Sequence, residues 1–268
     1  MRDKNGEQIL MAVASTSEQR ALEQDEVQSL AEAVAAAGKR IGLPYIAASA
    51  DISSPHPLID REGRPLAESI FPWLDPELRY WEDPGFALRA TIIQACRVCA
   101  EPFYLHQGQL ASWRHNGALD AVNEQESFEG FGVEAAIMVP CHLPGGVIGS
   151  VVWASPDPAL PVADIFHTHA SDLLTLALTF LSSYRDCSAR ARMEAPPRLT
   201  PREIQCLKWA ALGKTDAEVA IIMDISLPTV RFHITNAARK LAVSGRSQAL
   251  YRAAMLGYIG AAAGPARS

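Results

Sequence analysis

The 268-residue chain has no apolar run close to the roughly 18 residues that a membrane-spanning helix needs. Its apolar N-terminal stretch, residues 9–14, is short and has neither a basic flank nor a small-residue cleavage site, so it does not resemble a signal peptide. We therefore expect a soluble, cytoplasmic protein with no membrane partner.

Cysteines are also scarce: the chain has five, and an odd number argues against the disulfide framework of secreted domains. Cys96 and Cys99 form a C-x-x-C without a second pair at zinc spacing. We interpret them as small buried thiols, with redox or metal chemistry as the alternative. His167 and His169 lie two apart on a predicted helix and so face different ways. No Ser/His/Asp, phosphate-loop or paired-carboxylate pattern occurs, so we expect no catalytic residue, no metal site and no cofactor.

Basic residues are few over most of the chain and are concentrated at its C-terminal end. Residues 198–260 hold nine Lys and Arg against four Asp and Glu, whereas residues 1–197 hold 14 basic and 26 acidic side chains. A small basic region on an acidic body indicates that only this region meets a polyanion.

A polar segment with two consecutive prolines, Pro196 and Pro197, favours neither a helix nor a central strand. We place a linker at 186–198, between an N-terminal domain of residues 1–185 and a C-terminal domain of residues 199–268. Upstream of the linker, the patterns predict helices over 17–37, stopped by Gly38, over 83–98 and over 164–184. They predict strands over 43–50, 103–106, 135–142 and 147–154, the last two forming a hairpin around Pro144-Gly145-Gly146. Helices before and after an antiparallel sheet indicate an α/β/α sandwich, so the fold class is α+β.

The C-terminal domain contains signals for four short helices. Thr200 and Thr215 each begin a capping box, Ser226 is a third cap, and a fourth helix runs from Arg246 to a stop at Gly257. Two short helices joined by a tight turn, the second with a basic outer face, are typical of a helix-turn-helix.

The third of these helices is the candidate for reading DNA, because such helices insert their N-terminal half into the major groove. Arg231 and Thr235, one turn apart, are the candidates for contacts with base edges. Other side chains are predicted to contact phosphates or to line the same surface: Lys214, Thr215, Thr229, Phe232, Asn236, Arg239 and Lys240. The alternative is an ordinary solvated basic face.

Residues 199–241, LTPREIQCLKWAALGKTDAEVAIIMDISLPTVRFHITNAARKL, closely resemble the LuxR-type helix-turn-helix. The family's hallmark acidic, apolar and glycine positions match Glu203, Leu207 and Gly213, which also read as a capping-box acid, a core leucine and a helix stop. The family's histidine after the basic recognition position matches His233, which we interpret as structural.

The N-terminal domain more weakly resembles the autoinducer-binding domain of quorum-sensing LuxR regulators. The resemblance implies a pocket for an acyl-homoserine lactone, in which an Asp accepts the ligand amide and aromatic side chains donate to its carbonyls. Asp83-Pro84 matches the family's Asp-Pro, with a helix cap as the alternative role for Asp83. Aromatic candidates for the pocket are Trp73, Tyr80, Trp81, Tyr104 and Trp113, each with core packing as the alternative, and Ala136 stands where a glycine is usual.

Together these observations predict a sequence-specific transcription regulator, not an enzyme. We expect a homodimer on a palindromic duplex operator, a small-molecule autoinducer such as an acyl- or aryl-homoserine lactone, and RNA polymerase as a further candidate partner. The alternative hypothesis gives the N-terminal domain a non-lactone ligand, or a role as an interaction or enzymatic module that uses Asp83 or Cys141.

Overall fold

The computed structural model describes residues 4–75, 77, 79, 82, 90–124, 132–188 and 197–260, with side chains from residue 21 onward. The chain divides into two compact units, an N-terminal one of residues 1–143 and 147–191 and a C-terminal one of residues 192–268 with which residues 144–146 are grouped. Each unit is described by itself.

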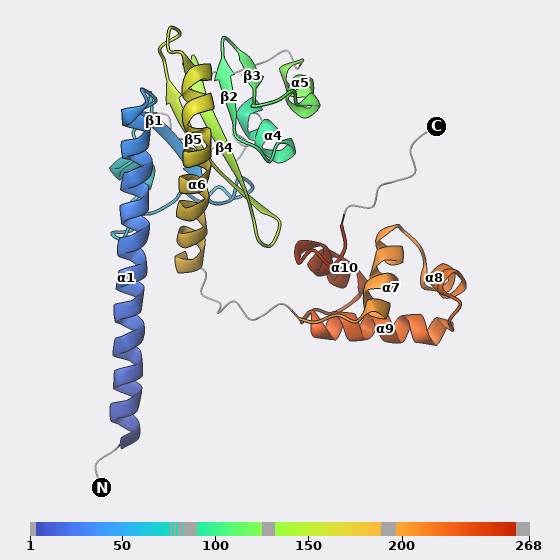
Figure 1. The fold of residues 1–268 in the computed structure, drawn as a ribbon. Coiled ribbons are helices and arrows are strands. Elements are labelled where there is room, and N and C mark those ends of the chain that lie inside the picture. The colour runs from blue at the N-terminus through green and yellow to red at the C-terminus, as the bar shows by residue number, and fades with distance from the viewer. Residues whose placement is uncertain are drawn as a thin grey trace. The chain divides into compact units, whose positions relative to one another are not determined.

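The N-terminal unit is built on a five-stranded antiparallel sheet of order β1-β5-β4-β2-β3. The strands are β1 (Tyr45–Ser49), β2 (Phe103–His106), β3 (Gln109–Ala111), β4 (Ala135–Leu143) and β5 (Val147–Ser155). The helices are α1 (Lys4–Arg40), α2 (Leu66–Ser69), α4 (Thr91–Val98), α5 (Gly117–Asn123) and α6 (Val162–Ser188). The predicted antiparallel sheet between helical layers is confirmed (Figure 1).

The β4–β5 hairpin forms the centre of this sheet and has both faces covered. Gly145 and Gly146 take positive φ angles of 82° and 69° at its tip, where Leu143 pairs with Val147. Side chains alternate along a strand, so Ile137 and Val139 enter one core while Ala136 and Met138 enter the other. The hairpin therefore separates two apolar layers.

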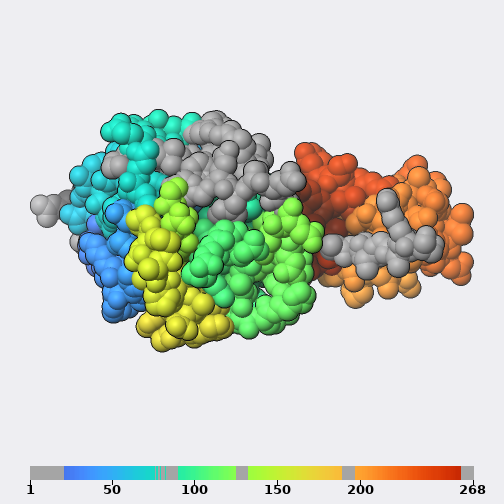
Figure 2. Space-filling view, turned by 90° about the horizontal axis from the view of Figure 1, so that it is seen from above, coloured from blue at the N-terminus to red at the C-terminus, as the bar shows by residue number. Residues whose placement is uncertain are grey.

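One layer lies under α1 and α6, which pack side by side (blue and yellow in Figures 1 and 2). Gly38 does not stop α1 as predicted, because the helix continues to Arg40. A Cβ at Gly38 would lie 2.5 Å from the Leu43 oxygen and 2.6 Å from Trp153 Cδ1. Trp153 Nε1 also donates to Val34 O at 3.0 Å. The glycine is thus needed for the close approach of helix and sheet.

The opposite layer lies under α4 and α5. The sequence patterns gave no prediction for α5 or β3. Asn116 caps α5 by accepting from Ala118 N–H, and the Asn123 side chain both accepts from and donates to the backbone of Leu110 in β3. A single asparagine thereby joins two elements that are too short to have a clear hydrophobic period. The first part of the helix predicted over 83–98 falls at 83–89, outside the described residues, and α4 accounts for the rest.

The C-terminal unit consists of α7 (Pro201–Ala211), α8 (Asp216–Met223), α9 (Leu227–Lys240) and α10 (Arg246–Met255). Both predicted capping boxes are present, at Thr200 with Glu203 and at Thr215 with Glu218, and Ser226 caps α9. Figure 1 shows α7, α8 and α10 gathered around α9. The predicted four-helix arrangement with a helix-turn-helix is confirmed.

Candidate functional site

The α8–α9 pair is held at a fixed angle by a tight turn and a buried face of α9. Asp224 ends α8 with a left-handed φ of 53°, and Ser226 then accepts from Thr229 N–H to begin α9. On α9, Val230 and Ile234 are buried in a core with α7 and α8, while Ala237 packs in a second core with α10. The remaining face of α9 is consequently turned to solvent.

That solvent face carries the predicted recognition residues. Arg231, Thr235 and Arg239 recur every four residues and are all exposed, so they form one stripe along α9. The Arg231 side chain is 67% exposed, and the neighbouring Phe232 is 62% exposed. Beside the stripe, Asn236 is half-buried and its Oδ1 accepts from Arg239 Nη2 at 3.4 Å. The structure therefore brings five of the predicted α9 residues onto one surface: Arg231, Phe232, Thr235, Asn236 and Arg239.

The predicted hydroxyl contacts at the start of α8 and α9 already have partners within the unit. Thr215 Oγ1 lies 2.8 Å from Glu218 Oε2 and accepts from Glu218 N–H, and Thr229 Oγ1 lies 2.7 Å from Ser226 Oγ. Lys214 Nζ lies 3.5 Å from Glu218 Oε1 and its side chain is partly exposed. The hydrogen bonds from Thr215, together with the charge of Lys214, lower the pKa of Glu218. Thr215 thus serves first as the cap of α8, while Thr229 is hydrogen-bonded to Ser226, the cap of α9.

Lys240 has a different environment from the one that the sequence suggested. It was predicted to contact phosphate, but its Nζ donates to Glu203 Oε2 at 2.9 Å. The Glu203 side chain is only 4% exposed and also accepts from Thr200 N–H at 2.7 Å. Burial alone would raise the pKa of Glu203, but the bonds from Lys240 and Thr200 and the charge of Lys240 outweigh it and lower the pKa. The amine of Lys240 is thus engaged inside the unit, where it joins α9 to α7.

The three hallmark positions have structural roles. Glu203 makes the contacts just described, Leu207 is fully buried between α7 and α9, and Gly213 takes a φ of 80° after α7. His233 is half-buried and packs edge-on against Phe232. These residues shape the helix-turn-helix rather than its exposed stripe.

The candidate ligand residues that the structure describes fall on two sides of the sheet. Trp73 and Ala136 pack in the layer under α4 and α5. Tyr104 and Trp113 instead pack on Phe166 of α6, with ring centroids 4.9 and 5.4 Å apart. A single cavity cannot be lined by all four, because the sheet lies between the pairs. Tyr80, Trp81 and Asp83 lie outside the described residues.

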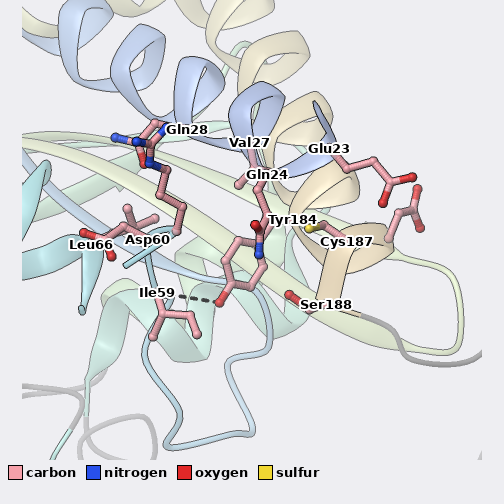
Figure 3. A pocket seen from close by; sticks show the side chains of 12 residues that line it. Glu23, Gln24, Val27, Gln28, Ile59, Asp60, Leu66, Tyr184, Cys187 and Ser188 are labelled. Atoms are coloured by element: carbon pink, nitrogen blue, oxygen red, sulfur yellow. Dashed lines mark hydrogen bonds between the residues drawn. The ribbon is translucent and has the colours of Figure 1, made fainter. Parts of the chain in front are cut away.

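A groove of about 520 Å³ opens on the α1–α6 side, between these helices and residues 59–66 (Figure 3). Tyr184 crosses it, and its hydroxyl accepts from Ile59 N–H at 3.0 Å. At its edge the buried Asp60 accepts from Arg64 N–H and Nε, which folds residues 59–65 into a closed turn. None of the predicted ligand residues that the structure describes lines this groove, and it lies on the side opposite Trp73 and Ala136.

The thiols are poorly suited to nucleophilic chemistry. Cys96, Cys99 and Cys141 are buried, and burial raises the pKa of each thiol, for Cys141 to about 12. Over the part of the chain that the structure describes, no three His, Cys, Asp or Glu residues are grouped as metal ligands. Within the same residues, no helix combines the length and apolarity that crossing a bilayer would require.

Comparisons with known proteins match both units. Residues 26–184 fit the family described as "Autoinducer binding domain", and residues 197–253 fit "Bacterial regulatory proteins, luxR family". The transcriptional activator protein LuxR of Aliivibrio fischeri is 30% identical over 181 residues, which are 68% of this chain and 70% of that protein. The transcriptional activator protein VanR of Vibrio anguillarum is 36% identical over 130 residues, 48% of this chain and 53% of that protein.

The chain spans about half the length of the first curated relatives it matches, 50–53% of each. A solved structure of SdiA in complex with octanoyl-rac-glycerol aligns with 90% of this chain and 95% of that chain, at 19% identity and a TM-score of 0.44. The two domain matches confirm the resemblance drawn from the sequence. The chain belongs to the LuxR family of bacterial regulatory proteins, with an autoinducer-binding domain preceding the helix-turn-helix that the family shares.

Proposed function

We propose that this chain is a transcription regulator that binds duplex DNA through α9 and changes its DNA affinity when its N-terminal unit binds a small molecule. The observation that carries the proposal is the stripe of Arg231, Thr235 and Arg239 on the exposed face of a helix whose other face is buried. The major groove of B-DNA is wide enough to admit such a helix.

Each residue of the stripe has a distinct role on DNA. Arg231 lies near the N-terminal end of α9 and donates to a guanine edge, while Thr235, one turn further, contacts a neighbouring base or methyl group. Arg239 and Lys214 lie toward the two ends of this surface and contact phosphates, which fix the register without selecting a sequence. A homodimer places two copies of α9 on the half-sites of a palindrome, and RNA polymerase is the partner through which the bound dimer alters transcription.

The ligand site lies on the α4–α5 side of the sheet, next to Trp73 and Ala136. This side is supported because both residues pack in that layer and residues 26–184 match an autoinducer-binding domain. An apolar cavity with a few polar groups suits an amphipathic autoinducer such as an acyl- or aryl-homoserine lactone. Tyr104 and Trp113 support the sheet from the other side by packing on Phe166.

The DNA-binding proposal is tested by selecting duplexes from a randomised pool with the full chain. We expect a palindromic consensus and a much weaker affinity for unrelated duplexes in fluorescence anisotropy at fixed salt. Cross-linking or light scattering should show a dimer on the selected site. A chain that enriches no sequence, or that binds its selected site as a strict monomer, would contradict the proposal.

The ligand proposal is tested by native mass spectrometry of the full chain with a panel of acyl- and aryl-homoserine lactones. We expect retention of at least one lactone and a shift in affinity for the selected duplex. Ala136→Leu should reduce retention, whereas Val27→Leu in the α1–α6 groove, on the other side of the sheet, should not. If only Val27→Leu reduces lactone retention, the ligand binds on the α1–α6 side of the sheet and the proposal is wrong.

A further inference from the structure

Asp216, which the sequence patterns did not single out, connects three helices of the C-terminal unit. It is the first residue of α8, and its side chain is 26% exposed. Its Oδ1 accepts from Arg246 Nη1 of α10 at 2.8 Å, and its Oδ2 lies 3.8 Å from Arg231 Nε of α9. The other terminal nitrogen of Arg246 donates to the Lys214 carbonyl just ahead of α8. One carboxylate thus lies between a structural arginine and the candidate recognition arginine.

The contact with Arg231 is made through Nε, on the inner edge of its guanidinium group. Among the described residues, neither Nη atom of Arg231 has a hydrogen-bond partner in the unit, and the side chain is mostly exposed. A guanine edge is read by two parallel donors of one guanidinium plane, at O6 and N7. A carboxylate 3.8 Å from Nε attracts the inner edge of that plane and leaves the Nη donors for the base.

The charge of Asp216 would ordinarily oppose DNA binding, because a carboxylate near phosphates repels them. Here two features offset it: the ion pair with Arg246, and the position in the first turn of α8, where the helix dipole favours a negative group. The arrangement keeps a carboxylate next to Arg231 without leaving its charge uncompensated at the DNA surface.

We infer that Asp216 is the positioning residue for Arg231 and sets the sequence discrimination of the helix-turn-helix. This inference rests on the proposed function, since it concerns how Arg231 reads a base. Asp216 contacts no base itself and acts through the orientation of the arginine side chain.

The test measures a discrimination ratio: the affinity for the selected duplex divided by the affinity for the same duplex with the guanine opposite Arg231 replaced. The guanine is identified as the position at which Arg231→Ala loses its preference. Asp216→Asn in the full chain should lower this ratio roughly three- to tenfold, because coupled neighbours commonly interact by that much. In the Arg231→Ala background, Asp216→Asn should leave the ratio unchanged.

Arg246→Gln is the matched control, because it also breaks the bridge between α8 and α10 but keeps the carboxylate beside Arg231. It should weaken binding to both duplexes and keep their ratio. The inference is overturned if Asp216→Asn keeps the ratio, if Arg246→Gln lowers it as much, or if the effect of Asp216→Asn persists without Arg231. If the wild-type chain selects no DNA sequence, the proposed function is overturned. If the wild-type chain is selective but Asp216→Asn does not change the discrimination ratio, only this inference is overturned.

Discussion

Replacing Lys240 by Met would leave the Glu203 carboxylate without its charged partner inside the helix-turn-helix. Met keeps most of the length of the lysine side chain but cannot donate to Glu203 Oε2, which the lysine reaches at 2.9 Å. The Glu203 side chain is 4% exposed, so water cannot take the place of the ammonium group. Thr200 N–H would remain as a partner. The C-terminal unit should therefore lose stability rather than DNA affinity alone.

The size of the loss follows from two limits. A hydrogen bond to a charged group contributes about 1.5–3 kcal/mol, and breaking a fully buried ion pair costs about 3–5 kcal/mol. The Lys240 side chain is 32% exposed, so its pair with Glu203 is partly screened and the lower range applies. We expect a loss of about 1–3 kcal/mol in the free energy of unfolding. Each kcal/mol lowers the melting temperature of a unit of this size by about 4–8 °C.

The dependence of stability on pH should also differ between the wild-type chain and Lys240→Met. In the wild-type chain the pKa of Glu203 lies below its ordinary value near 4.5, so its contribution to stability is present above that pH and is lost as the pH falls through the lowered pKa. Without Lys240, two of the interactions that lower the pKa of Glu203 are lost while burial and the bonds from Thr200 remain, so the pKa rises relative to the wild-type chain. The stability of the variant should therefore fall less steeply than that of the wild-type chain as the pH is lowered below 4.5.

Differential scanning calorimetry of the full chain measures the transition of the C-terminal unit for both variants. Lys208→Met, at an exposed position of α7, is the matched control and should change stability by less than about 0.5 kcal/mol. Glu203→Gln should cost less than Lys240→Met, because Gln serves in a capping box and the lysine can reach water. If Lys240→Met is no more costly than Lys208→Met, the reasoning from burial is refuted.

Three further predictions concern other parts of the chain. Arg231→Ala should lose about 1–3 kcal/mol of discrimination between the selected duplex and a base-substituted one, measured by competition anisotropy, and equal losses on both duplexes would refute a role in reading bases. Gly38→Ala should destabilise the N-terminal unit by about 1–3 kcal/mol in urea unfolding, because its Cβ would meet the Leu43 backbone and Trp153. Lys39→Ala is the control. If Gly38→Ala does not change the free energy of unfolding, α1 can shift away from the sheet at little cost and the reasoning is wrong. Thr215→Ala should lower the stability of the C-terminal unit by about 1 kcal/mol through loss of its cap, and an unchanged melting temperature would contradict that role.

The sequence alone was sufficient to predict those structural features that depend on residues close together in the chain. The capping boxes at Thr200 and Thr215, the cap at Ser226 and the glycine turn between β4 and β5 each depend on residues within a few positions of one another. A cap or a tight turn satisfies backbone groups locally, so its residues have the same meaning in almost any tertiary context. The positions of most helices and strands followed from these signals, whereas α5 and β3 did not.

The candidate site could be predicted only in part from the sequence. The buried and exposed faces of α9 followed from helical periodicity, which placed Arg231 and Thr235 on one surface. The side of the sheet that holds the ligand could not be predicted from the sequence. Periodicity shows that Tyr104 and Ala136 are partly or fully buried, but it does not show in which layer each one lies. Their separation depends on which helix covers each face of the sheet.

The sequence by itself determined the order and type of most elements and the identity of the helix-turn-helix. The tertiary structure decided which charged groups meet: Lys240 reaches Glu203 across 37 residues, and Arg246 reaches Asp216 across 30. It also decided that Gly38 serves a helix–sheet contact rather than a helix end. The physical reason is that backbone hydrogen bonding is satisfied within a few residues, whereas burial and ion pairing depend on the path that the whole chain takes through space.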